Sequence, residues 1–119
     1  MTPKKILMIL DDAPGVGRAL SRALGRHFDE VHAFTSAAEA SALLERMPVT
    51  HVICDQSLGQ GDPSGLELIP SWRRSHASIE RAIILTGLAE STLRPGPEID
   101  GIVSKLVGPE ELARMLKGG

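Results

Sequence analysis

Five short aliphatic runs recur along the chain, separated by segments in which apolar residues repeat at helical spacing. The runs predict strands at residues 5–10, 31–34, 51–55, 82–86 and 101–105. The first run is apolar at successive positions, which is typical of a strand buried on both faces of a parallel sheet. The chain therefore reads as strands and helices in alternation.

Helix start signals lie between these runs. Pro14 occupies the first position of one predicted helix, and Ser36 and Ser64 each stand three residues before a glutamate, as in a capping box. Residues 88–94 have room for only one or two helical turns before Pro-Gly-Pro, and Pro109 begins a last helix. Strands alternating with such helices imply right-handed βαβ units. We predict one domain, residues 1–119, with a doubly wound parallel sheet covered by helices on both faces.

Polar side chains follow four of the five predicted strands. Asp11 and Asp12 follow the first, Asp55 ends the third, Thr86 ends the fourth and Lys105 ends the fifth. The carboxyl ends of parallel strands form the edge where open α/β sheets bind ligands. Two carboxylates ~4 Å apart repel by about 4 kcal/mol at an effective dielectric of ~20, so three of them require a counter-charge or protonation. Mg²⁺ suits one or two carboxylates combined with waters and a phosphoryl oxygen.

These residue types fit phosphoryl transfer, which needs an in-line nucleophile, a metal ion and donors for the remaining oxygens. Asp55 would be the nucleophile and become an aspartyl phosphate, while Thr86 and Lys105 would bind phosphoryl oxygens. The simpler interpretation is that the acids only cap helix starts, for which Asp12 is well placed. Polar groups at four strand ends together favour the phosphoryl site over capping.

The ordered set of Asp-Asp, Asp, Thr and Lys resembles that of bacterial response-regulator receiver domains, and the likeness runs from Ile6 to Leu116. It implies a flavodoxin-like sheet of strand order 2-1-3-4-5 with the pocket at the switch between strands one and three. It also implies phosphotransfer to Asp55 from a sensor histidine kinase or a phosphotransfer protein, in two-component signalling. The metal ligands would be Asp11, Asp12, Asp55 and the backbone carbonyl of Ser57. The motifs that carry the resemblance are Ile9-Leu10-Asp11-Asp12, His51-Val52-Ile53-Cys54-Asp55, Ser64-Gly65-Leu66-Glu67-Leu68 and Ile84-Leu85-Thr86-Gly87.

The chain departs from the family pattern at several positions around the predicted site. Leu106 follows Lys105 where the family has a cis proline; because a non-proline cis bond costs ~3–4 kcal/mol, we predict a trans bond and a shifted Lys105 backbone. Ile102 replaces the usual aromatic residue, and the loop of residues 56–65 is longer than usual, with Gly59 in place of a proline. A pseudo-receiver, an interaction module independent of phosphorylation, is therefore the alternative. A phosphatase or phosphotransferase would need a substrate-binding insertion that is lacking, so we expect no turnover of a separate substrate.

Composition and charge narrow the remaining classes of function. The net charge of −2 and only three aromatic residues argue against direct nucleic-acid binding. No apolar run or leader pattern indicates a membrane span or export, and Cys54, the single cysteine, is expected to be a buried small hydrophobe. We expect a cytoplasmic protein, acting on a downstream partner or on an output domain absent from this chain. The segment Trp72-Arg73-Arg74 is interpreted as a partly solvated helix face rather than a contact patch.

Overall fold

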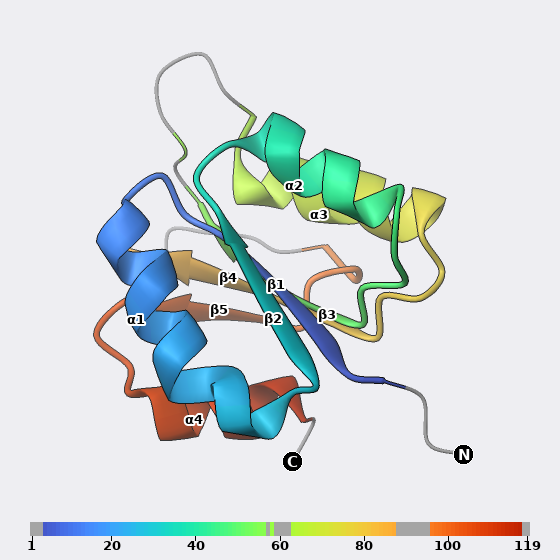
Figure 1. Ribbon diagram of the computed structural model, residues 1–119. Helices are drawn as coiled ribbons and strands as arrows, with labels where there is room; N and C mark the ends of the chain where they lie inside the picture. Colours follow the sequence, from blue (N-terminus) through green and yellow to red (C-terminus); the bar gives the residue numbers. More distant parts are fainter. Residues whose placement is uncertain (1–3, 57, 59–62, 88–95, 118–119) are drawn as a thin grey trace.

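The computed structural model describes residues 4–56, 58, 63–87 and 96–117. Its strands form one parallel sheet of order β2-β1-β3-β4-β5, with helices between them (Figure 1). The strands are β1 (Ile6–Leu10), β2 (Glu30–Phe34), β3 (His51–Asp55), β4 (Arg81–Thr86) and β5 (Gly101–Ser104). The helices are α1 (Pro14–Leu24), the 3-10 helix η1 (Gly25–His27), α2 (Ala37–Leu44), α3 (Gly65–Ser75) and α4 (Pro109–Leu116).

The predicted fold class and strand order are confirmed. All five predicted strands are present, with ends that differ by one residue at most. The fifth strand ends at Ser104, so Lys105 follows the strand instead of ending it. The short helix expected at residues 88–94 lies outside the described residues.

Two apolar layers enclose the sheet. Figure 1 shows α2 and α3 on one face and α1 and α4 on the other. Strand β1 serves both layers: Met8 and Leu10 pack in the α2–α3 layer, whereas Leu7 and Ile9 pack in the α1–α4 layer. These side chains have no exposed surface. Alternation along a strand sends neighbouring residues to opposite faces, which explains why β1 is apolar throughout. Cys54 is buried in the α2–α3 layer, as predicted.

Helix starts follow the sequence signals with one exception. The Ser36 hydroxyl accepts a hydrogen bond from the Glu39 amide at 3.2 Å, and the Glu67 carboxylate accepts one from the Ser64 amide at 2.8 Å. Helix α1 begins at the predicted proline, but its cap position is Ala13, which has no side-chain oxygen to accept from the first helical amides. The interpretation of Asp12 as a helix cap is therefore wrong, because Asp12 lies one position before the cap position.

Trp72 does not lie on a solvated face. It is 5% exposed, and its indole Nε1 donates to the hydroxyl of Ser41 at 3.1 Å, which ties α3 to α2. The neighbouring Arg74 is exposed, so the predicted solvated face is correct there and wrong for the tryptophan. Within the described ranges, no helix is both long and apolar enough to cross a bilayer.

Candidate functional site: an acidic pocket at the carboxyl end of the sheet

The strand register brings the predicted site residues to one edge. Leu10 pairs with Cys54, so Asp11 and Asp55 follow at the same end of two adjacent strands. On the other side of β3, Asp55 pairs with a residue of β4, one position before Thr86. Parallel strands present their carboxyl ends at a common edge, and this pairing places three site residues there.

Lys105 joins the pocket from the segment after β5. Its backbone amide donates to the Thr86 carbonyl at 3.0 Å, which fixes the start of that segment beside β4. Its side-chain Nζ then lies 2.9 Å from Oδ2 of Asp55 and 3.3 Å from Oδ2 of Asp11. The two carboxylates are buried, whereas the lysine side chain is 32% exposed. One ammonium therefore lies between two buried carboxylates from different strands.

The carboxylates change the protonation equilibrium of this lysine. Partial burial by itself favours the neutral amine, but the hydrogen bond to Asp55 and the negative charge of Asp11 outweigh it and raise the pKa of Lys105 above its usual value. The side chain is thus held as an ammonium at neutral pH, which is the form that binds an anionic oxygen.

The acids also have the geometry of a metal site. One carboxylate oxygen each from Asp11, Asp12 and Asp55 lies within 4.8 Å of the others. Oδ1 of Asp11 accepts a hydrogen bond from the Ala13 amide at 2.9 Å, which orients the carboxylate. Oδ2 of Asp11 is buried and, among the described residues, accepts no hydrogen bond, although the Lys105 ammonium is near. A buried oxygen with unfilled capacity beside two further carboxylates is a suitable set of ligands for a hard divalent cation.

The remaining predicted site residues differ in their burial and in whether the structure describes them. Thr86 is 1% exposed at the end of β4, at the same edge as Asp55. Asp12 is exposed and approaches the pocket from its solvent side. Ser57, predicted to offer its carbonyl to the metal, lies outside the described residues.

Gln56, which the sequence analysis did not single out, and Gly65 hold the segment around Asp55. The Gln56 amide donates to the Leu85 carbonyl at 2.9 Å, and its side-chain Oε1 accepts from the Leu66 amide at 3.1 Å. The Gly65 amide donates to the Gln56 carbonyl at 3.2 Å. The start of α3 is thereby bound to the end of β3. The glycine after the capping serine was visible in the sequence as a motif, but its packing role was not.

No family model matches the chain. Among curated proteins, it is 36% identical over 85 residues to the acid tolerance regulatory protein ActR of Sinorhizobium medicae. This match covers 71% of the present chain and 42% of the relative, so the chain spans less than half the length of that protein.

Solved structures share the whole fold. A receiver domain protein (CheY-like) from Methanospirillum hungatei superposes with a TM-score of 0.83 over 98% of this chain and 93% of its own, at 24% identity. A response regulator from Burkholderia pseudomallei, solved with a phosphorylated aspartic acid, a calcium ion and citrate, gives a TM-score of 0.78. That match covers 94% of this chain and 66% of the other, again at 24% identity. At these identities the likeness establishes the fold.

Proposed function

This chain is a response-regulator receiver domain, and from that premise we propose that it accepts a phosphoryl group on Asp55. The observation that carries the proposal is the ammonium of Lys105, which lies within 3.3 Å of carboxylate oxygens of both Asp55 and Asp11. Such a cation would bind an oxygen of the incoming phosphoryl group. Three acids without any partner would not favour an anionic substrate.

The proposed reaction asks little of the protein beyond position and charge. A carboxylate oxygen of Asp55 attacks phosphorus, and the bond from phosphorus to the donor breaks, with its electron pair leaving on the donor. Lys105 compensates charge on one phosphoryl oxygen, and the hydroxyl of Thr86 is the proposed donor to another. Asp55 is suited to the nucleophilic role because strand β3, which carries it, is buried and held on both sides.

The three acids are the proposed ligands of a Mg²⁺ ion. Asp11, Asp12 and Asp55 supply the carboxylate oxygens that lie within 4.8 Å of one another. The carbonyl of Ser57 is proposed as a further ligand on the strength of the family resemblance alone. When bound, the ion would neutralise charge on the phosphoryl oxygens and on the crowded acids.

The proposed partners follow from the same role. A sensor histidine kinase or a phosphotransfer protein would supply the phosphoryl group, in the cytoplasm. A downstream protein or an output domain would respond to the phosphorylated state. Turnover of a separate substrate is not part of this proposal, because the acceptor is a residue of the chain itself.

Intact mass spectrometry after incubation with acetyl phosphate and Mg²⁺ tests the proposal. The wild-type chain should gain the mass of one phosphoryl group, and Asp55→Asn should gain none. Asp29→Asn is the matched control, because Oδ2 of Asp29 accepts from the Lys5 amide at 2.7 Å at the other end of the sheet. An adduct that persists in Asp55→Asn would remove that residue from the role.

Two observations favour the alternative, an interaction module that works without phosphorylation. Leu106, which follows Lys105, is 95% exposed, and Ile102 occupies the partly buried position where the family has an aromatic ring. A folded wild-type chain that shows no phosphoryl adduct and no response to Mg²⁺ would support this alternative. Labelling of the wild type that requires Mg²⁺ would exclude it.

A further inference from the structure

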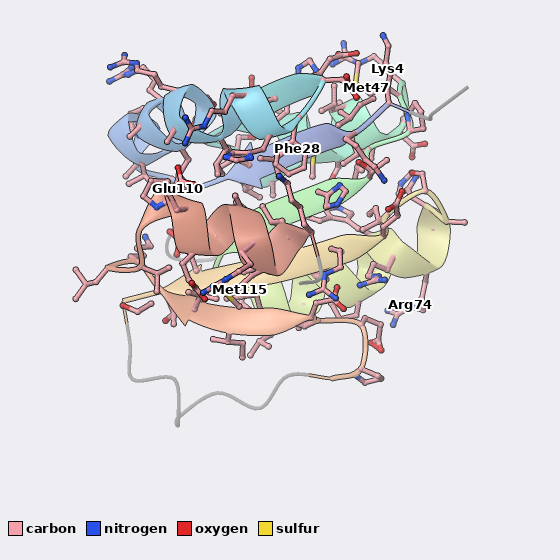
Figure 2. All side chains as sticks on the ribbon, turned by 90° about the horizontal axis from the view of Figure 1, so that it is seen from below. Lys4, Phe28, Met47, Arg74, Glu110 and Met115 are labelled. Carbon is pink, nitrogen blue, oxygen red and sulfur yellow. The ribbon has the colours of Figure 1, made fainter. Side chains whose placement is uncertain are left out.

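A cavity of about 500 Å³ lies at the end of the sheet opposite the acidic pocket. Lys5, His51 and Arg81, which line it, stand before or at the start of β1, β3 and β4. Figure 2 shows Phe28, another lining residue, between the α1 side of the molecule and helix α4. The volume falls within the range of about 300–1,000 Å³ that is usual for small-molecule sites. No residue of the acidic pocket contributes to this cavity.

The floor of the cavity is aromatic, and a hydrogen bond orients one of its two rings. The rings of Phe28 and His51 meet edge to face with centroids 5.1 Å apart, and both residues are at most 9% exposed. Nδ1 of His51 lies 2.7 Å from the Thr50 hydroxyl, and that hydroxyl also bonds both the amide and the carbonyl of Ile6. A flat ring or a short apolar group placed on this floor would contact surfaces that need no rearrangement.

The rim of the cavity carries an excess of positive charge. Three cations, Lys5, Arg81 and Lys117, face one carboxylate, Glu80, which pairs with Lys5 at 3.3 Å. Arg81 donates to the Met115 carbonyl at 2.8 Å. Its Nη1 lies 3.7 Å from Oδ1 of Asp100, which does not line the cavity.

Lys117 is the cation of the rim with the least compensation. Its Nζ lies 3.0 Å from Nδ1 of His27, and it has no carboxylate partner within the part of the chain that the structure describes. The one carboxylate of the lining, Glu80, pairs with Lys5, so the ammonium of Lys117 is available to an anion in the cavity.

We propose that this cavity binds a small organic anion: a carboxylate or phosphate carried on a ring or a short apolar body. The body would rest on Phe28 and His51, and the anionic group would face Lys117 and the guanidinium of Arg81. The site is separate from the proposed phosphoacceptor and would exist even if Asp55 were never phosphorylated.

Amide chemical-shift mapping of the full chain, with benzoate and phenyl phosphate as probes, tests this inference. At constant ionic strength, the amides of Phe28, His51 and Lys117 should shift in a saturable manner. Benzyl alcohol, which has the ring without the charge, should give no saturable shift at the same concentrations. A response to only one anionic probe would assign the site to carboxylates or to phosphates.

Two lysine variants decide whether the rim charge is responsible. Lys117→Gln should weaken the binding of the anionic probe about tenfold, the loss expected for one charge-assisted hydrogen bond. Lys4→Gln is the matched control, because Lys4 pairs with Glu30 at 3.3 Å and does not line the cavity. Equal affinity in both variants, shifts scattered over the surface, or an equal response to benzyl alcohol would overturn the proposal.

Discussion

Gly65 lies directly against the backbone of Asp55: a β-carbon at position 65 would stand 3.0 Å from the Asp55 carbonyl oxygen. Such a β-carbon would also meet Cγ1 of Ile84 at 3.4 Å. The first residue of α3 is therefore small because the helix starts next to the proposed phosphoacceptor. The position of the acceptor and the docking of this helix on the sheet are set by the same contact.

Gly65→Ala should destabilise the fold and disturb the acceptor. Because the added methyl group meets backbone atoms that have little room to move, we expect a loss of about 1–2 kcal/mol in the free energy of unfolding. Urea unfolding measures this loss. Gly15→Ala is the control, because a β-carbon there meets no atom within 4 Å and alanine favours the helix. Equal stability of the two variants would contradict the packing argument.

Mg²⁺ should stabilise the folded chain through the three acids. A ligand that binds only the native state adds about 2.7 kcal/mol at a concentration of 100 times its dissociation constant. Thermal unfolding with increasing MgCl₂, compared with NaCl of equal ionic strength, should show this rise in the wild type. In Asp12→Asn the rise should be much smaller, although the fold should persist because Asp12 is exposed. The same rise in both proteins would exclude Asp12 as a ligand.

Lys105 and Asp55 should be energetically coupled. Lys105→Met leaves two buried carboxylates without their shared cation, whereas in an Asp55→Asn background it leaves one. The substitution should therefore cost less in that background, with a coupling of about 0.5–3 kcal/mol. A double-mutant cycle of unfolding free energies measures it. Additive effects would mean that the 2.9 Å contact contributes nothing to stability.

Stability should fall in mild acid because of His51. Burial disfavours its imidazolium and lowers the pKa of His51 below its usual value of 6.5. The unfolded chain therefore takes up this proton first as the pH falls below about 6.5. The stability present above that pH is lost progressively down to the lowered native pKa. Unfolding free energies at about pH 7.5 and about pH 5 measure the effect.

Two variants isolate this contribution. His51→Gln cannot take up the proton, so its stability should change less between the two pH values than that of the wild type. His76→Gln, directly after α3, is the control for the removal of a histidine. An unchanged dependence in His51→Gln would show that another group is responsible.

The thiol of Cys54 should be inert in the folded chain. Burial is the main cause that raises the pKa of Cys54, and the charge of Asp55 adds to it, so almost no thiolate is present at neutral pH. Iodoacetamide should leave the native protein unmodified over hours, and should alkylate it readily once urea has unfolded it. Rapid alkylation in native buffer would mean that strand β3 opens far more often than its burial implies.

Local sequence patterns were sufficient for the strands, for the starts of the capped helices and for the residue types at the pocket. The apolar runs located all five strands, because a strand buried on both faces must be apolar at successive positions. The capping signals of Ser36 and Ser64 located the starts of α2 and α3, because such hydrogen bonds join residues only three apart. The acids at the strand ends were also visible, because each directly follows an apolar run.

The contacts between distant residues were decided only by the tertiary structure. The pairing of Leu10 with Cys54 sets Asp11 beside Asp55, and a side-chain period of two residues cannot by itself choose that partner. Nor can it predict the contact of the Lys105 ammonium with the Asp55 carboxylate, or that of Gly65 with the Asp55 carbonyl. A sequence period reports which face a side chain occupies, whereas the distance between two strands depends on how the whole sheet is assembled.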